Sequence, residues 1–205
     1  MPEQKSAPPR GSEKKKKSML GKIALLLLAL FLVGAGITVL IGARGIHLRS
    51  ATVVNLSPEE SWSFFQNPHN LAEWDRSVAR VEPTSSGEVG LGYTFDTIAP
   101  PQPGQKEGMR MSYRVTKFVS PQRAEISLVN SPMFQEAVWA MIVEPVSEGT
   151  RIISEVRFVP KLQYSFLVPV LLFTSKDALG TDMKYLKACM EAASEDKDPS
   201  PGSQR

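Results

Sequence analysis

An uncharged apolar run at residues 23–43, IALLLLALFLVGAGITVLIGA, constrains this chain more than any other feature. A 21-residue helix is about 30 Å long, which matches the hydrocarbon core of a bilayer. A soluble helix would carry polar residues along one face, whereas only Thr38 interrupts this run. We therefore predict a transmembrane helix over residues 19–43. A cleaved signal peptide is the alternative, because Val33 and Ala35 roughly fit the cleavage rule, although the apolar run continues past them.

The formal net charge of +3 is divided unevenly along the chain. Residues 1–43 hold seven Lys or Arg and two acids, so 17 bases and 19 acids remain in residues 44–205. The positive-inside rule then predicts a cytoplasmic N-terminus and a body on the exported side, periplasmic or extracellular. Residues 1–18 are rich in Pro, Gly, Ser and Lys, which predicts a disordered basic arm beside the membrane. The slightly acidic body predicts no nucleic-acid partner.

The body, residues 44–193, has the pattern of an α+β domain. Apolar residues alternate from Ile46 to Leu56, which predicts a strand. Ser57 and Glu60 then form a predicted capping box, with Pro58 at the first helical position. Two short helices follow, and the second ends near Trp74. Consecutive alternating segments on short turns predict an antiparallel sheet from residue 78 to residue 158.

Two further segments complete the predicted domain. Residues 99–108, APPQPGQKEG, contain too many Pro and Gly for a helix or strand and predict a long loop. After Pro160, apolar residues recur near a spacing of 3.6 as far as Met190, which predicts a long C-terminal helix. Residues 194–205 are polar and predict a disordered tail.

This order of elements resembles the helix-grip fold of the START-like, or SRPBCC, superfamily, and in particular its polyketide cyclase/dehydrase-like branch. The resemblance is carried by residues 56–83, LSPEESWSFFQNPHNLAEWDRSVARVEP, where Trp74 and Asp75 form the Trp-Asp pair before an apolar strand. Residues 144–158, EPVSEGTRIISEVRF, and the YLKACME of the last helix also resemble the branch. The resemblance spans about residues 46–192. It implies an antiparallel sheet wrapped around a long C-terminal helix, with two short helices after the first strand.

The sequence offers few candidates for catalysis. His47 and His69 are the two histidines, and neither has a partner in the pattern. Cys189 lies among apolar residues of the last helix and is expected to be an inert thiol that forms no internal disulfide. We therefore predict no catalytic residue, metal or cofactor. An enzyme would need an ionisable group directed into the fold, for example Glu136 or Arg157.

The residues alone favour a solid core, whereas the resemblance implies a cavity between the sheet and the C-terminal helix. Large soft side chains are expected to line it: Phe65, Trp74, Tyr93, Phe95, Met111, Tyr113, Ile126, Trp139, Met141, Phe158, Met183 and Leu186. The last helix and residues 99–108 would gate it. We expect a membrane-tethered domain that binds a lipid or other hydrophobic small molecule. The alternatives are a polyketide cyclase/dehydrase-type enzyme and an envelope assembly or stress factor that acts through protein contacts.

Overall fold

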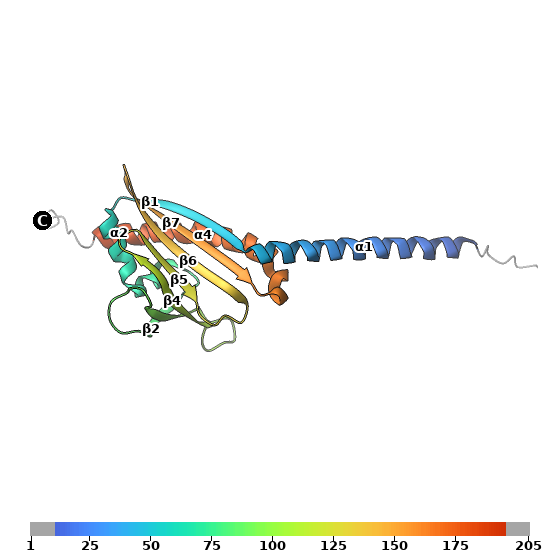
Figure 1. Ribbon diagram of the computed structural model, residues 1–205, viewed down its shortest axis with the longest axis horizontal. Coiled ribbons are helices and arrows are strands. Elements are labelled where there is room, and N and C mark those ends of the chain that lie inside the picture. The colour runs from blue at the N-terminus through green and yellow to red at the C-terminus, as the bar shows by residue number, and fades with distance from the viewer. Residues whose placement is uncertain (1–10, 196–205) are drawn as a thin grey trace, which may run out of the picture.

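The computed structural model describes residues 11–195, which form a long N-terminal helix followed by an α+β domain (Figure 1). The domain contains a seven-stranded antiparallel sheet in the order β1-β7-β6-β5-β4-β3-β2. Three short helical segments follow the first strand, and a long helix closes the described chain. The elements are α1 (Gly11–Arg44), β1 (Ile46–Val54), α2 (Pro58–Gln66), η1 (Pro68–Asn70), α3 (Leu71–Trp74), β2 (Arg80–Pro83), β3 (Thr94–Ile98), β4 (Arg110–Val119), β5 (Arg123–Leu128), β6 (Phe134–Val146), β7 (Gly149–Pro160), η2 (Leu162–Leu167) and α4 (Val168–Glu195).

Local signals start the short helices where the sequence predicts them. The Ser57 side chain accepts from the Glu60 backbone N–H, and the Glu60 carboxylate accepts from the Ser57 N–H at 2.8 Å. This reciprocal pair satisfies donors that the first turn of α2 leaves without helical partners. At the other end of α2, Asn70 Nδ2 donates to the Phe64 carbonyl oxygen, which ties η1 back to the helix that precedes it. The sequence therefore fixes the compact turn that carries α2, η1 and α3.

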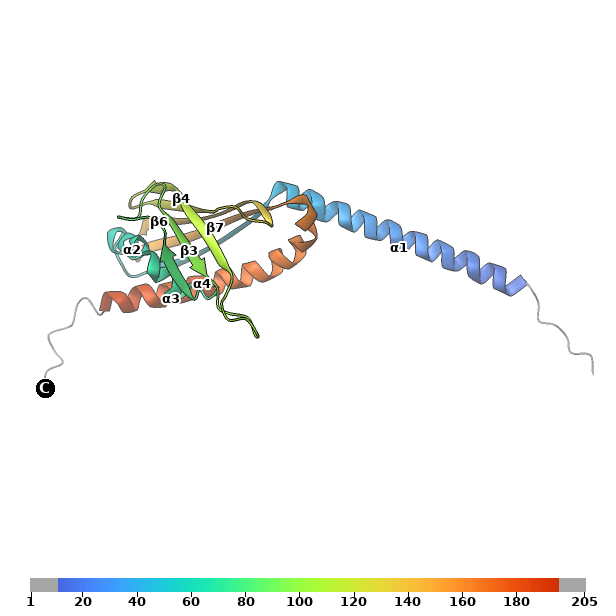
Figure 2. The same cartoon turned by 90° about the horizontal axis from the view of Figure 1, so that it is seen from below.

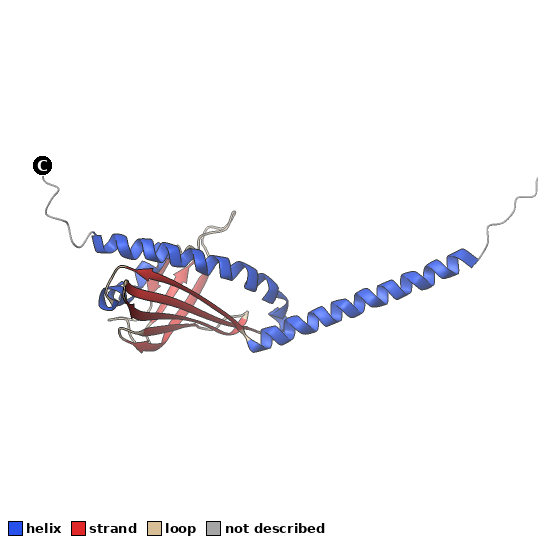
Figure 3. Cartoon of the chain, turned by 90° about the horizontal axis from the view of Figure 1, so that it is seen from above, coloured by secondary structure: helices blue, strands red, loops and turns tan. Residues whose placement is uncertain are grey.

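The sheet curves, and α4 lies along its concave face, so the fold is a helix-grip fold (Figures 2 and 3). The C-terminal half of α4 packs directly on this face: Met183, Leu186 and Met190 are each at most 1% exposed. They form one core cluster with Val54 of β1 and Ile152 of β7. The long helix is therefore seated mainly over the β1–β7 side of the sheet.

Residues that face the concave side pair directly across neighbouring strands. Phe95 lies opposite Tyr113, Ile126 opposite Trp139, and Ala137 opposite Phe158. In β6 the register shifts between Phe134 and Glu136, where two residues of β6 occupy the space of one in β7. A bulge of this kind changes which side chains face inward. Phe134 therefore faces the same side as Ala137 although the two are an odd number of residues apart.

Helix α1 extends away from the domain, and its segment Gly21–Arg44 is apolar and long enough to cross a membrane (Figure 1). The most apolar 18 residues of this segment have a mean hydropathy of 2.8, and none of these 18 is buried inside the protein. The segment is a candidate membrane span, and a signal sequence would have the same composition and the same position in the chain. The helix begins at Gly11, so residues 11–18 are helical where we predicted a disordered arm. Helical propensity of the lysine run, continuous with the apolar helix, accounts for this difference. Residues 1–10 and 196–205, also predicted to be disordered, lie outside the described residues.

Candidate functional site: an apolar cavity under the short helices

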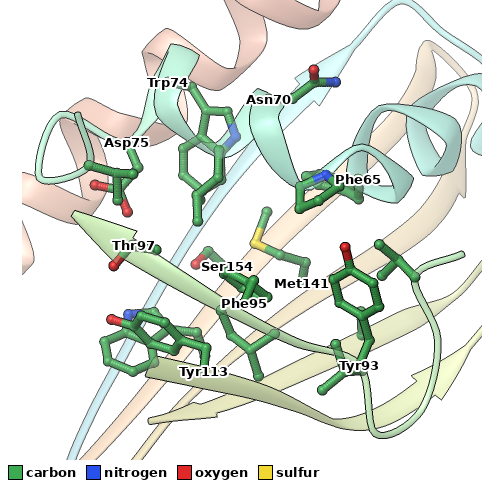
Figure 4. A pocket seen from close by; sticks show the side chains of 18 of the residues that line it. Phe65, Asn70, Trp74, Asp75, Tyr93, Phe95, Thr97, Tyr113, Met141 and Ser154 are labelled. Carbon is green, nitrogen blue, oxygen red and sulfur yellow. The ribbon is translucent and has the colours of Figure 1, made fainter. Parts of the chain in front are cut away.

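A cavity of about 360 Å³ lies between the concave face of the sheet and the short helices (Figure 4). It is about twelve times the 30 Å³ that one water molecule occupies in the liquid, whereas voids in a packed core rarely exceed a single water. The cavity is therefore larger than a packing defect, and its volume falls within the range of small-molecule binding pockets. Gln66, Asn67 and Ser77 line it and are exposed, so they mark where it meets the solvent.

The sheet side of the cavity is a continuous series of aromatic rings that crosses four strands. The Phe95 ring stacks on Tyr113 at 5.6 Å between centroids, and Tyr113 meets the Trp139 ring edge-to-face at 5.5 Å. Trp139 in turn meets Phe158 edge-to-face at 5.2 Å. Such pairs favour offset or perpendicular geometry because the ring faces carry negative charge and the edges positive charge. The four aromatic side chains therefore contact one another along the sheet, and the cavity lies on their open side.

The short helices supply the opposite wall. Trp62, Phe64 and Phe65 come from α2. Pro68 and Asn70 come from η1, and Leu71 and Trp74 come from α3. The Trp74 side chain points toward the sheet (Figure 4). From α4 the described residues contribute only Leu171. The cavity therefore lies mainly beneath α2, η1 and α3, whereas we predicted it between the sheet and the C-terminal helix.

The structure brings ten of the twelve predicted lining residues to the cavity and leaves two outside it. The two exceptions, Met183 and Leu186, are fully buried in the core between α4 and the sheet. Their helix packs directly on β1 and β7, so no space remains beneath them. The ten that line the cavity are Phe65, Trp74, Tyr93, Phe95, Met111, Tyr113, Ile126, Trp139, Met141 and Phe158.

Sequence reasoning missed several polar lining residues, including Thr97 and Ser154 on strands. It considered Asp75 only as part of the Trp-Asp pair, and the Asp75 carboxylate accepts from the Ser77 N–H at 2.9 Å and from Ser77 Oγ at 2.6 Å. Asp75 nevertheless also lines the cavity. The alternation that places Phe95 inward places Thr97 inward as well, so strand periodicity contained the signal. None of residues 99–108, predicted to gate the cavity, lines it.

Asp75, Thr97 and Tyr113 lie together on one side of the cavity, with Tyr93 and Phe65 on the other (Figure 4). The pKa of Tyr113 is raised to about 12, chiefly by burial and then by the Asp75 carboxylate, while the Thr97 hydroxyl opposes the shift. Thr97 Oγ1 is buried and has no hydrogen-bond partner among the described residues, and the same holds for Trp62 Nε1 at another part of the wall. The cavity thus has one polar side within an otherwise apolar lining.

The other residues considered for catalysis lie elsewhere. Arg157 donates to Glu136 at 2.7 Å on the outer face of the sheet. Glu136 faces outward by regular alternation, because Ala137 and Trp139 of the same strand face inward. Glu136 and Arg157, which an enzyme would need to direct into the fold, therefore form an ion pair on the outer face of the sheet. His47 shares that outer face, and His69 is exposed on η1. Burial and then Glu73 raise the pKa of the Cys189 thiol, which disfavours the reactive thiolate.

Comparison with known proteins agrees with this geometry. The family described as polyketide cyclase / dehydrase and lipid transport matches residues 45–189. No curated protein matches the chain. A protein of unknown function from Staphylococcus aureus superimposes with a TM-score of 0.59 at 13% identity, covering 74% of this chain and 96% of that one.

Two further solved structures share the fold. The protein TTHA0849 from Thermus thermophilus has a TM-score of 0.57 at 13% identity, with coverage of 73% and 99%. The di-domain aromatase/cyclase StfQ of the steffimycin biosynthetic pathway has a TM-score of 0.58 at 11% identity. The match covers 73% of this chain and 52% of StfQ. At these identities the likeness shows the shared fold.

Proposed function

Because this chain belongs to the polyketide cyclase / dehydrase and lipid transport family, we propose that it binds a hydrophobic small molecule, such as a lipid, beside a membrane. The observation that carries this proposal is the 360 Å³ apolar cavity. Each methylene that moves from water into it gains about 0.8 kcal/mol. Met111 and Met141 in the lining have flexible side chains that adapt to ligand shape. An assembly factor acting only through protein contacts would need no such space.

The packing around the end of α1 supports the membrane tether. A Cβ placed on Gly42 would lie 3.1 Å from Ser165 Oγ and 3.3 Å from Val168 Cγ2, so η2 packs against the last turn of α1. If residues 23–43 span the bilayer, η2 lies at the depth of the headgroups. The side chains of this region leave apolar surface in that plane: Leu162, Phe166, Val170 and Phe173 are each more than half exposed. Large apolar side chains exposed beside a span suit the membrane interface.

The tether is tested by quenching of a fluorophore with spin-labelled lipids, using the full chain in vesicles. Single cysteines at Leu40, Phe173 and Leu91, each in a Cys189→Ser background, would carry the fluorophore. We expect strong quenching at Leu40 within the span and at Phe173 beside it. Leu91 is an equally exposed apolar residue near the opposite edge of the sheet and should be unquenched. An unquenched Leu40 would refute the tether.

Ligand binding is tested with an aromatic plug in the cavity. Ala124 lines the cavity on β5, so Ala124→Phe should fill part of it and reduce uptake of the neutral dye Nile red. Thr116→Phe is the matched control, because it adds a phenyl ring on the exposed face of the neighbouring strand. Equal dye binding by both variants and the wild type would contradict binding in this cavity. Mass spectrometry of molecules that co-purify with the wild type would identify the ligand.

A cyclase-type activity is the second candidate, and the pair Asp75 and Tyr113 favours it. They are ionisable groups beside the cavity, and an acid or base near a bound substrate is what proton transfer requires. The test is turnover of a polyketide-like substrate by the wild type and by Asp75→Asn. If Asp75→Asn binds the substrate as well as the wild type but loses turnover, the enzyme reading is favoured over the carrier reading.

A further inference from the structure

The charge pattern of the cavity selects among hydrophobic ligands. Among residues 11–195, its lining contains one carboxylate, Asp75, two phenols and several neutral polar groups, but no Lys, Arg or His. An anionic head group in such a site would lose its hydration without gaining a cationic partner. Asp75 would add repulsion. The cavity therefore disfavours carboxylates and phosphates.

Hydrogen-bonding groups at the polar side are present but poorly satisfied. Thr97 is 1% exposed, and its Oγ1 has no hydrogen-bond partner within 3.5 Å among the described residues. The Thr97 hydroxyl lies beside that of Tyr113, whose pKa it lowers slightly against the larger effect of burial. The Tyr113 hydroxyl contacts Met111 Sδ at 3.8 Å, and a thioether is a weak acceptor. Both side chains come from adjacent strands, where Thr97 lies opposite Met111 in the register. A buried polar atom that makes no hydrogen bond is unfavourable unless another group, such as a ligand atom, forms that hydrogen bond.

Asp75 adds an acceptor to these two hydroxyls. Both hydrogen bonds from Ser77 reach Oδ1, and Oδ2 accepts none from the described part of the chain. Burial is the main cause of the raised pKa of Tyr113 and of Asp182, and the Asp75 carboxylate is the second cause of each. The polar side thus offers hydroxyl groups and an anionic acceptor within one region (Figure 4). A ligand hydroxyl can use both, since its hydrogen donates while its oxygen accepts.

We propose that the cavity is selective for uncharged apolar molecules that carry a hydroxyl group, which binds among Asp75, Thr97 and Tyr113. The ligand O–H donates to the Asp75 carboxylate, and its oxygen accepts from the Thr97 or Tyr113 hydroxyl. The apolar body lies along the aromatic wall formed by Phe95, Tyr113 and Trp139. This inference rests on the proposed ligand-binding function and narrows it from hydrophobic molecules to neutral alcohols or phenols.

Three probes with the same hydrocarbon chain test the head-group preference: 1-dodecanol, dodecanoate and dodecane. Binding to the full chain in lipid nanodiscs would be read from tryptophan fluorescence, because Trp74 and Trp139 line the cavity. Empty nanodiscs correct for partition into lipid. At pH 8 we expect 1-dodecanol to bind about tenfold more tightly than dodecanoate or dodecane. Thr97→Val should remove most of that advantage, so that 1-dodecanol binds with an affinity close to that of dodecane. The matched control is Thr116→Val, the same change on the exposed face of β4.

The outcomes separate this inference from the function on which it rests. Equal affinity for all three probes, or tighter binding of dodecanoate, would overturn the head-group selectivity while leaving a hydrophobic cavity in place. Failure of every probe to bind would overturn the proposed function together with the selectivity. If Thr97→Val also weakens dodecane binding, the threonine acts through the shape of the wall, and the hydrogen-bonding role is wrong. Asp75→Asn removes the negative charge and should narrow the gap between alcohol and carboxylate.

Discussion

Replacing Trp139 with Ala distinguishes a ligand-lined wall from an ordinary core. Trp139 lies in the middle of the aromatic series and makes two edge-to-face contacts, to Tyr113 at 5.5 Å and to Phe158 at 5.2 Å. Each such contact contributes about 0.5–1.5 kcal/mol beyond area burial. Truncating a Trp in a solid core costs about 3–5 kcal/mol. One side of this ring borders the cavity and loses no packing when the ring is removed. We therefore expect Trp139→Ala to lower the free energy of unfolding by about 1–3 kcal/mol, which is the sum of the two edge-to-face contacts.

Leu186→Ala is the comparison for a filled site. Leu186 is 0% exposed and packs between α4 and the sheet, away from the cavity. Its truncation should cost about 3 kcal/mol or more and leave ligand binding intact. Urea unfolding followed by circular dichroism gives both free energies without relying on tryptophan emission. Nile red titration of the folded variants gives binding. If Trp139→Ala costs as much as Leu186→Ala and does not weaken dye binding, Trp139 is a core residue and our reading of the wall is wrong.

Three further predictions concern the tether, the domain and a carboxyl group. Alkaline phosphatase fused after Arg205 should be active in a bacterial host, because the bases lie before the span; an inactive cytoplasmic fusion would contradict the orientation. Residues 44–205 should fold without α1, which contacts the domain near its last turn; a molten product in circular dichroism would show otherwise. Burial and then Asp75 raise the pKa of Asp182 to about 6, so folding favours the neutral form of this carboxyl group. The resulting contribution to the free energy of unfolding is fully present below pH ~4 and is lost as the pH rises through 6. Asp182→Asn should therefore stabilise the domain at pH 8 by about 1 kcal/mol or less, since the partly exposed side chain is still screened by solvent, and be neutral at pH 4.

The sequence predicted the elements of the fold because local patterns specify them. The alternation of Met111, Tyr113 and Val115 identified the inward face of β4, and both Tyr113 and Val115 are buried there. The capping box at Ser57 set the start of α2 within one residue. These signals depend on side chains a few residues apart, so one sequence is enough to read them.

The inward direction of Phe134, which lines the cavity, was harder to predict, for a physical reason. Strand periodicity assumes one residue per step, and the bulge between Phe134 and Glu136 breaks that count. Whether a bulge forms depends on the pairing of β6 with β7, which lies more than a dozen residues away along the chain. The position of Met183 and Leu186 depends in the same way on where α4 crosses the sheet. Contacts between distant segments decide both, and no local pattern contains them.

The existence of the cavity depends on coverage of the sheet, which strand periodicity does not describe. Alternation shows which side chains face inward, but it is the same whether atoms or empty space lie opposite. Here α4 packs over β1 and β7, and Leu171 is its one contribution to the cavity lining among the described residues. The short helices must cover the β3–β6 side, and they are too short to fill it even with Trp62, Phe65 and Trp74. The cavity remains because the sheet is wider than the area that α2, η1, α3 and α4 cover. A longer α2 or a shifted α4 would remove it without altering the inward pattern of a single strand.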